Sequence, residues 1–276
     1  MELYTSVSYD LSKRLTLSYS SSFGISSRLF APELKLHIYA VYGLVRIADE
    51  IVDTYRGDNA REQLDAFEKD TLAAIETGYS TNPIIHAFAQ TARKYTITAE
   101  LLQPFFASMR IDLSPATYTD EDYQSYIHGS AEVVGLMCLK VFCEGDERMY
   151  TTLAPGATAL GAAYQKVNFL RDIASDYTEL GRMYFPGITF DTFDEREKAL
   201  IVADIKADFN TANSAIHKLP TSCQTAVRVS YTYYTELLKK LDETPVSTLK
   251  ERRIRISTPR KLWLLMKTVL TQRIRS

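Results

Sequence analysis

Prolines divide this chain into segments whose apolar residues recur at the spacing of an α-helix, and this pattern limits the possible folds most strongly. The segments are long enough for helices of roughly ten to thirty residues. No convincing run of alternating polar and apolar residues predicts a strand. The sequence therefore predicts an all-α protein, with residues 1–276 forming a single helical domain. The breaks are expected at Pro32, Pro83, Pro104, Pro115, Pro155, Pro186, Pro220, Pro245 and Pro259.

Five helices can be outlined from these patterns. Residues 32–55 carry an apolar stripe, and residues 119–142 begin with a threonine and three acidic residues that suit a helix start. The segment from Pro155 to about residue 177 is rich in alanine and glycine, which favours close helix packing. Residues 194–217 and 220–242 are expected to form two more amphipathic helices.

Composition excludes several classes of protein. A net charge of −2 gives no overall attraction to nucleic acid, so no nucleic-acid partner is expected. Three cysteines are too few for a disulfide framework or a zinc site, which favours the reducing cytoplasm. The start of the chain does not resemble a signal peptide, and no uninterrupted apolar run is long enough to span a bilayer. Residues 250–275 are locally basic, which suits a phosphate-facing or membrane-facing surface, or a solvated helix end.

Two carboxylates, Asp49 and Asp53, stand four residues apart near the end of the first of these helices. On an α-helix this spacing puts both on one face, one turn apart, where like charges repel. A bound cation would turn that repulsion into binding energy. Such pairs also occur on solvent-exposed faces, but the apolar stretch before Asp49 indicates an interior position.

A second group of oxygen-bearing side chains lies in residues 164–176. Asn168, Asp172 and Asp176 repeat every four residues, and Gln165 precedes them. Oxygen ligands suit Mg²⁺, which keeps several waters and commonly bridges a protein carboxylate to substrate phosphate. Two such faces meeting across a helical bundle would clamp a diphosphate through metal ions. Mn²⁺ is an alternative metal.

Cationic and hydroxyl groups accompany both acidic motifs. Arg46 lies one turn before the first motif, Arg171 lies within the second, and Arg182 and Tyr184 follow it. Arginine binds phosphate oxygens bidentately, and tyrosine donates a further hydrogen bond. Each arginine taken alone is equally compatible with a surface salt bridge.

At these residues the sequence resembles the squalene/phytoene synthase family over nearly its whole length. Residues 160–186 (LGAAYQKVNFLRDIASDYTELGRMYFP) match the family's second signature throughout, and residues 20–53 are similar to its amino-terminal region. Residues 251–265 resemble the phytoene synthase branch. The first signature, residues 126–142, is less regular, because Glu132 stands where a small residue is usual and Ile127 is also unusual, but the run is similar to that of bacterial, Bacteroidetes-type phytoene synthases. We expect the Glu132 side chain to turn toward water; the alternative is an extra polar group near the reaction.

The resemblance implies a helical bundle of the isoprenoid synthase type with a central cavity, and it implies roles for particular residues. Metal ions and diphosphates would be held by Asp49, Asp53, Asn168, Asp172 and Asp176. Phosphate would be contacted by Arg46, Arg171, Tyr184 and Arg253. The reaction chamber would be lined by Phe23, Tyr42, Tyr126, Gln165 and Tyr234.

The implied activity is the head-to-head condensation of two prenyl diphosphates through a cyclopropylcarbinyl diphosphate. The first expectation is phytoene synthesis from two geranylgeranyl diphosphates, in carotenoid biosynthesis. Squalene or dehydrosqualene synthesis from farnesyl diphosphate is the alternative, because both use the same motifs. A non-catalytic helical scaffold of the same fold is the alternative of another class. Oily substrates and the basic carboxy-terminal segment further suggest a cytoplasmic protein that binds reversibly to the inner face of the membrane.

Overall fold

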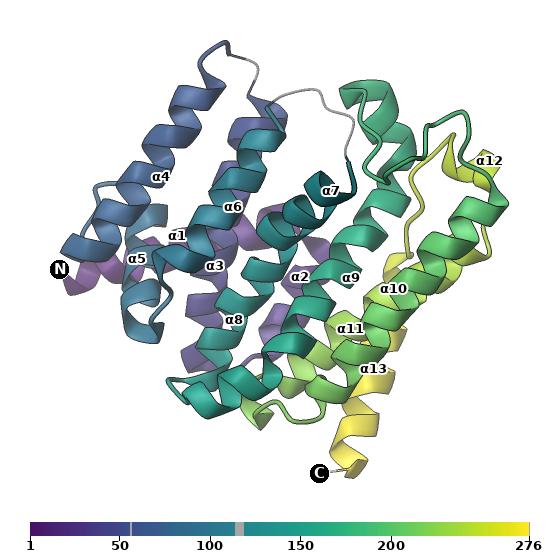
Figure 1. The fold of residues 1–276 in the computed structure, drawn as a ribbon. Helices are drawn as coiled ribbons and strands as arrows, with labels where there is room; N and C mark the ends of the chain where they lie inside the picture. Colours follow the sequence, from purple (N-terminus) through teal and green to yellow (C-terminus); the bar gives the residue numbers. More distant parts are fainter. Residues whose placement is uncertain (56, 114–118, 276) are drawn as a thin grey trace.

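The computed structural model describes residues 1–55, 57–113 and 119–275, and every regular element in these ranges is helical (Figure 1). The expected all-α fold is therefore confirmed. The α-helices are α1 (Glu2–Tyr19), α2 (Ser21–Ser26), α3 (Pro32–Asp49), α4 (Ala60–Thr77), α5 (Pro83–Tyr95), α6 (Ala99–Ile111), α7 (Asp120–Ile127), α8 (Val133–Cys143), α9 (Glu147–Leu180), α10 (Glu195–Ile216), α11 (Thr221–Asp242), α12 (Val246–Leu249) and α13 (Thr258–Arg275). Three short turns interrupt them: the 3₁₀ turn η1 (Ser27–Leu29) and the π-helical turns η2 (Glu50–Thr54) and η3 (His128–Glu132).

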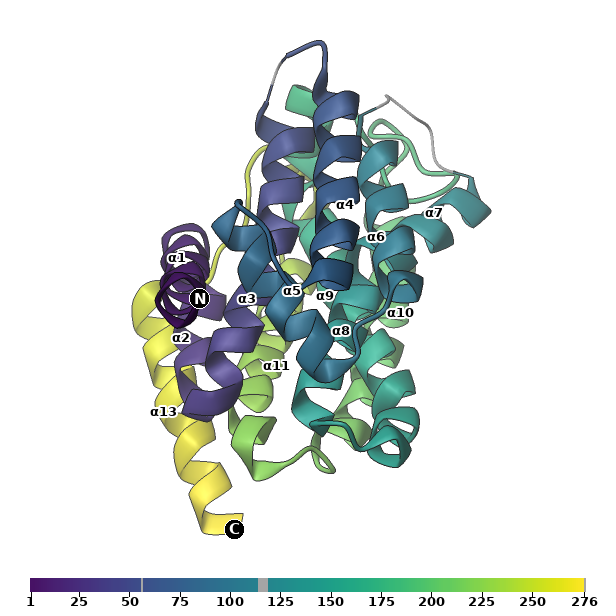
Figure 2. The ribbon, with the colours of Figure 1, turned by 90° about the vertical axis from the view of Figure 1, so that its left-hand side faces the viewer.

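The long helix α9 organises the bundle, because it packs against α10 on one side and against α8 and η3 on another. α1, α3 and α5 pack on one another, as do α11 and α13. In Figure 2, α1, α2 and α13 lie on the left-hand side of the molecule, while α7 and α10 lie on the right. Two large apolar clusters fill the interior, one built mainly from α3, α5, α6 and α8, the other from α7, α9, α10 and α11, and a small third cluster joins α11 to α13.

Local signals placed several helix ends correctly. Pro32 and Pro83 occupy the first turn of α3 and α5, where the missing N–H of proline costs nothing. Thr119 begins α7 with a capping box, since its hydroxyl accepts from the Asp122 N–H and the Asp122 side chain accepts from the Thr119 N–H. α10 and α11 also lie within the ranges expected for them.

Two expected breaks are wrong, and one lies outside the described residues. Pro104 lies inside α6 and Pro155 lies inside the 34-residue helix α9. A proline in a helix interior loses a hydrogen bond, so tertiary packing must hold these helices together. Next to Pro155, Gly156 sits so close to Ala215 of α10 that it has no room for a side chain. The break expected at Pro115 falls in the segment that the structure does not describe.

The helices expected over residues 32–55 and 119–142 are each interrupted by a π-helical turn. The first runs as α3 to Asp49 and continues as η2; the second runs as α7, η3 and α8. Single π-helical turns inside α-helices occur often at functional sites. Both turns here carry residues of the motifs identified in the sequence.

The continuous helical run Asp120–Cys143 is long and apolar enough, by length and composition alone, to be a candidate membrane span. Half of its most apolar window is buried against the rest of the protein, and α8 packs on α3, α6 and α9. Core helices of globular proteins have the same composition. The run is therefore weak support for a membrane crossing.

Candidate active site

The first acidic motif lies where α3 passes into η2. Asp49 is the last residue of α3, and its side chain is 31% exposed; Asp53 lies in η2 and is 47% exposed. The π-helical geometry changes the stacking expected for residues four apart on an α-helix. Arg46 forms an ion pair with Glu50 and lies 3.9 Å, Nη1 to Oδ2, from Asp49. Its guanidinium also stacks 4.4 Å from the Tyr19 ring.

The second acidic motif occupies the carboxy-terminal half of α9. Asp172 accepts from Arg171 through both oxygens, at 2.9 and 2.5 Å, and lies 2.7 Å from Arg253 Nε. One turn earlier, Asn168 Oδ1 accepts a 3.4 Å hydrogen bond from the Tyr234 hydroxyl. Two predicted phosphate-binding arginines therefore meet on one predicted metal ligand.

The two motifs, more than 100 residues apart in sequence, approach each other in the structure. The charge of Asp53 raises the pKa of Asp49 and also that of Asp176 on α9. Arg182 joins them, because its Nη1 lies 3.6 Å from Asp53 Oδ1 and its charge lowers the pKa of Asp176. The two groups of carboxylates therefore lie close enough for their charges to act on one another.

Burial and crowding of like charges make Asp49 and Asp176 weak acids. Burial is the largest cause that raises the pKa of Asp49 to about 8, with Asp53, Asp112 and Glu50 adding to it and Arg46 opposing it. For Asp176, burial again comes first and Asp172 second, and together they raise its pKa to about 7. Carboxylates with raised pKa values beside a specific charge partner are typical of functional sites.

Sequence reasoning missed a third acidic position, Asp112, at the carboxy-terminal end of α6. Its side chain is only 4% exposed and lies 3.2 Å from the Arg182 guanidinium. Its Oδ2 accepts a 2.7 Å hydrogen bond from the Tyr126 hydroxyl. Asp112 belongs to no repeating acidic pattern, so no signal in the sequence alone could have found it.

Aromatic side chains surround the acidic groups in three stacks. Phe23 and Tyr42 stack with ring centroids 5.4 Å apart, and both are partly exposed. Tyr126 stacks on Tyr184 at 5.5 Å, and Tyr184 stacks on Phe169 at 4.0 Å. The predicted chamber residues therefore include aromatic faces able to stabilise a cation. The third stack joins Tyr234 to Tyr164 at 3.9 Å.

The polar residue Gln165 and the unusual Glu132 lie where α9 meets η3. Gln165 Nε2 donates to the Ser130 hydroxyl at 3.2 Å. Glu132 lies 2.9 Å from Nδ1 of His128, whose side chain is 49% exposed, so the Glu132 carboxylate is directed to a half-exposed partner. At Gly161 a side chain would meet the main chain of Ala131 at 2.6 Å, so this glycine serves close packing.

The acidic groups fit a metal only in company with substrate. Among the described residues, no three His, Cys, Asp or Glu side chains converge closely enough to hold one ion by themselves. Mg²⁺ sites commonly use one or two carboxylates together with waters and substrate phosphates. Two neighbouring groups of carboxylates, in which Asp49 and Asp176 have raised pKa values, match that arrangement, because cations and a diphosphate would supply the missing ligands and relieve the repulsion.

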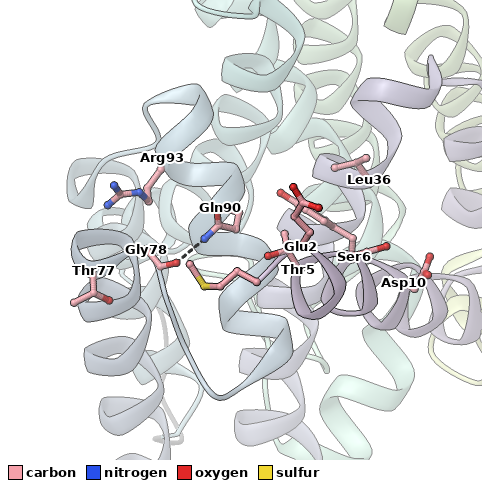
Figure 3. A pocket seen from close by; sticks show the side chains of 11 residues that line it. Glu2, Thr5, Ser6, Asp10, Leu36, Thr77, Gly78, Gln90 and Arg93 are labelled. Atoms are coloured by element: carbon pink, nitrogen blue, oxygen red, sulfur yellow. Dashed lines mark hydrogen bonds between the residues drawn. The ribbon is translucent and has the colours of Figure 1, made fainter.

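Two surface hollows lie away from these residues. One has a volume of about 750 Å³ and is bordered by α1, α4 and α5, where Gln90 donates to the Gly78 carbonyl at 2.6 Å (Figure 3). The other, about 280 Å³, lies at the start of α9 near Lys218. Neither is bordered by a predicted site residue. The central cavity expected for the fold therefore remains a prediction.

Comparison with known proteins identifies the family of this chain. The squalene/phytoene synthase family model matches residues 17–260. A phytoene synthase of Pseudescherichia vulneris is 26% identical over 90% of this chain and 86% of its own length. The 15-cis-phytoene synthase of a Synechocystis strain is also 26% identical, over 93% of this chain and 83% of its own.

Solved structures resemble the fold. A dehydrosqualene synthase aligns with a TM-score of 0.82 over 98% of both chains at 19% identity. A squalene synthase of Alicyclobacillus acidocaldarius aligns with a TM-score of 0.76 at 24% identity, over 91% of this chain and 97% of its own. At these identities the likeness establishes the isoprenoid synthase fold alone. Since the family model covers most of the chain, this protein belongs to the squalene/phytoene synthase family, whose members are prenyltransferases.

Proposed function

We propose that this protein is a phytoene synthase, which joins two geranylgeranyl diphosphates head to head to give phytoene. The observation that carries the proposal is the approach of two acidic faces, from η2 and from α9, with Arg182 between them. Such a site suits the departure of a diphosphate from an allylic carbon. The C20 substrate is supported by the curated relatives, which are named phytoene synthases.

Two sets of ligands on opposite sides would hold Mg²⁺, with Mn²⁺ as an alternative. Asp49 and Asp53 form one side, and Asn168, Asp172 and Asp176 form the other. When bound, the metal would neutralise charge on the leaving diphosphate. A bound cation would favour the ionised form of Asp49 and Asp176, whose pKa values burial and crowding raise, and it would relieve that crowding.

The arginines are positioned to exchange partners when substrate binds. Arg171 and Arg253 both contact Asp172, and Arg253 is 43% exposed. A diphosphate entering the site would offer them oxygens in place of that carboxylate, which would be freed to bind metal. Arg46 at the end of α3 and the Tyr184 hydroxyl would supply further contacts to phosphate.

In the first step the C–O bond to one diphosphate breaks, and the double bond of the second molecule attacks the allylic cation. This forms the cyclopropylcarbinyl diphosphate and releases a proton. In the second step that diphosphate leaves, the carbon skeleton rearranges, and loss of another proton gives the triene. The faces of Phe23, Tyr42, Tyr126 and Tyr234 would stabilise the cations and exclude water, and Gln165 would order the polar end of the chamber.

Squalene or dehydrosqualene synthesis from C15 farnesyl diphosphate is the second candidate, because solved structures with this fold carry those names. Incubation with each diphosphate and Mg²⁺, followed by product analysis, separates the two. A C40 triene from the C20 substrate is the expected result. A C30 product alone would move the protein to the squalene branch, and no product from either would revive the scaffold alternative.

We further propose that the protein docks on anionic membranes through α13. This helix contains five basic residues and no acidic one. Along one face it exposes Leu262, Trp263, Met266 and Leu270, each more than 40% accessible. Arg260 and Lys267 lie over the Trp263 ring at 4.3 and 5.1 Å, although Arg260 also pairs with Glu236. An apolar stripe bordered by cations matches the chemistry of an anionic lipid surface.

A second exposed apolar stripe lies on α1, and it could face the same membrane surface as α13. α1 exposes Leu3, Val7 and Leu11 at one-turn intervals, and in Figure 2 it lies on the same side as α13. We expect co-flotation with anionic liposomes at low salt, and loss of it in a Trp263→Ala/Leu270→Ala variant. Leu200→Ala on α10, on the other side in Figure 2, is the matched control. Absence of flotation at low salt would refute this membrane surface.

A further inference from the structure

Asp112 is a buried carboxylate that belongs to neither acidic motif. It follows the last residue of α6, where the negative end of the helix dipole disfavours a carboxylate. Its side chain is 4% exposed, and a buried ion pair adds little net stability over apolar side chains of similar volume. Stability alone therefore gives a poor account of this residue, and its contacts provide a better one.

Asp112 holds Arg182 through both its side chain and its main chain. Its Oδ1 lies 3.2 Å from Arg182 Nη1, and its carbonyl oxygen accepts a hydrogen bond from Arg182 Nη2. The same Nη1 lies 3.6 Å from Asp53 Oδ1 and donates to the Tyr184 hydroxyl at 3.3 Å. The location of Asp112 therefore decides how the Arg182 guanidinium faces the junction of the two acidic motifs.

The other oxygen of Asp112 acts on Tyr126. It accepts the Tyr126 hydroxyl hydrogen at 2.7 Å, while the Tyr126 ring stacks 5.5 Å from Tyr184 and lies 5.9 Å from Phe169. A phenol that donates to a carboxylate has a more electron-rich ring, and an electron-rich ring attracts a cation more strongly. The hydrogen bond also fixes the tilt of the ring.

We propose that Asp112 is a positioning residue for prenyl transfer, holding the Arg182 guanidinium at the diphosphate side and the Tyr126 ring at the carbocation side of the site. The inference rests on the proposed function, since both of these partners act on the reacting prenyl diphosphates. Asp112 itself touches neither substrate nor metal. Through its one buried side chain, Asp112 links Arg182 at the diphosphate side to Tyr126 at the carbocation side.

The first test is Asp112→Asn, which keeps the shape and the acceptor for Tyr126 but removes the charge that holds Arg182. We expect kcat to fall roughly 10–100-fold, as for groups that orient direct ligands, with a much smaller change in KM. Asp208→Asn is the matched control, because it breaks the 2.8 Å pair with Lys166 between α9 and α10. The control should lower the melting temperature and leave kcat unchanged.

A double-mutant cycle with Tyr126→Phe separates positioning from folding. Asp112→Leu is used in this cycle, because leucine removes the acceptor for Tyr126 that asparagine keeps. If Asp112 acts through Tyr126, the loss of kcat in the double variant is smaller than the product of the two single losses. Independent effects, or kcat of Asp112→Asn within about twofold of wild type, would overturn the proposal. Should Asp112→Leu not fold, Arg182→Lys replaces it in the same cycle. A wild-type protein that makes no product refutes the proposed function as well, whereas an active wild type with an unaffected Asn variant refutes only this inference.

Discussion

The two ends of α3 enclose polar groups in opposite ways. Near its start, His37 is buried and hydrogen-bonded to Thr91 at 2.9 Å and Tyr9 at 3.2 Å, with Lys94 Nζ 3.3 Å from its other nitrogen. Burial, with Lys94 second, lowers the pKa of His37 to about 4, so the ring is neutral. At the far end, burial and like charges raise the pKa of Asp49 to about 8.

The difference distinguishes buried polar groups that only support the fold from polar groups that await a ligand, within one helix. Each ring nitrogen of His37 has a hydrogen-bonding partner from a neighbouring side chain, so no outside ligand is needed there. Around Asp49, several carboxylates share too little compensating charge, and a ligand from outside would relieve the repulsion. A cluster of weakened acids is therefore a better sign of a site than buried polarity in general.

Removal of a proposed metal ligand should have the largest effect. Asp49→Ala and Asp172→Ala are each expected to lower kcat at least about 100-fold, because each removes a carboxylate that would hold the metal ions on the leaving diphosphate. Steady-state assays with a folded-state check by circular dichroism would measure this. Neither change removes core volume, so the melting temperature should stay near that of wild type. Near-normal activity in either variant would contradict the metal assignment.

Binding of Mg²⁺ and pyrophosphate should stabilise the protein, and this gain should depend on Asp49 at the acidic end of α3 and not on His37 at the other end. Mg²⁺ together with inorganic pyrophosphate at 100 times its dissociation constant would add about 2.7 kcal/mol to the free energy of unfolding. Thermal shift assays would detect the gain. Asp49→Ala should lose it and His37→Leu should keep it; equal shifts in both variants would mean that binding occurs elsewhere.

At the other end of α3, His37→Leu should affect stability and spare catalysis. The change removes two hydrogen bonds of the His37 ring, to the Thr91 and Tyr9 hydroxyls, at about 0.5–1.5 kcal/mol each. The two hydroxyls keep each other as partners at 3.2 Å. Urea unfolding would measure the loss, and kcat at a temperature where the variant is folded should equal that of wild type. A large fall in kcat would mean that the two ends of α3 are coupled.

The pH dependence of stability should differ in sign between the two ends. Raised pKa values mean that folded Asp49, Asp112 and Asp176 bind protons that the unfolded chain releases, so their contribution to stability is lost as pH rises toward about 8. His37, with its lowered pKa, opposes this only below about pH 6.5. Without metal, stability should therefore rise as pH falls from about 8 to about 6.5.

Urea unfolding midpoints, measured with a metal chelator between about pH 6.5 and about pH 8, would test whether stability rises as pH falls. Asp49→Asn should flatten the profile, because the variant side chain does not titrate. Added Mg²⁺ and pyrophosphate should flatten it too. Stability that rises with pH in this window would show that the carboxylates are not crowded in solution.

Sequence reasoning succeeded where the signal is local. Pro83 lies in the first turn of α5, and the Thr119 capping box begins α7, because a few neighbouring residues decide a helix start. It failed at Pro104 and Pro155, since packing partners distant in sequence outweigh the local cost of proline. The π-helical turn at Asp53 was missed for a similar reason, because residues four apart look alike in α- and π-helical segments.

The sequence by itself determined the all-α fold, the family and the two acidic motifs, because each rests on residue types at short, regular spacings. Only the tertiary structure decided that the charge of Asp53 acts on Asp176, and that Arg182 pairs with both Asp53 and Asp112. Those contacts join α6, η2 and the region around α9, and interactions across such sequence distances leave no periodic pattern. Burial, which weakens the acids, likewise arises only when the helices pack together.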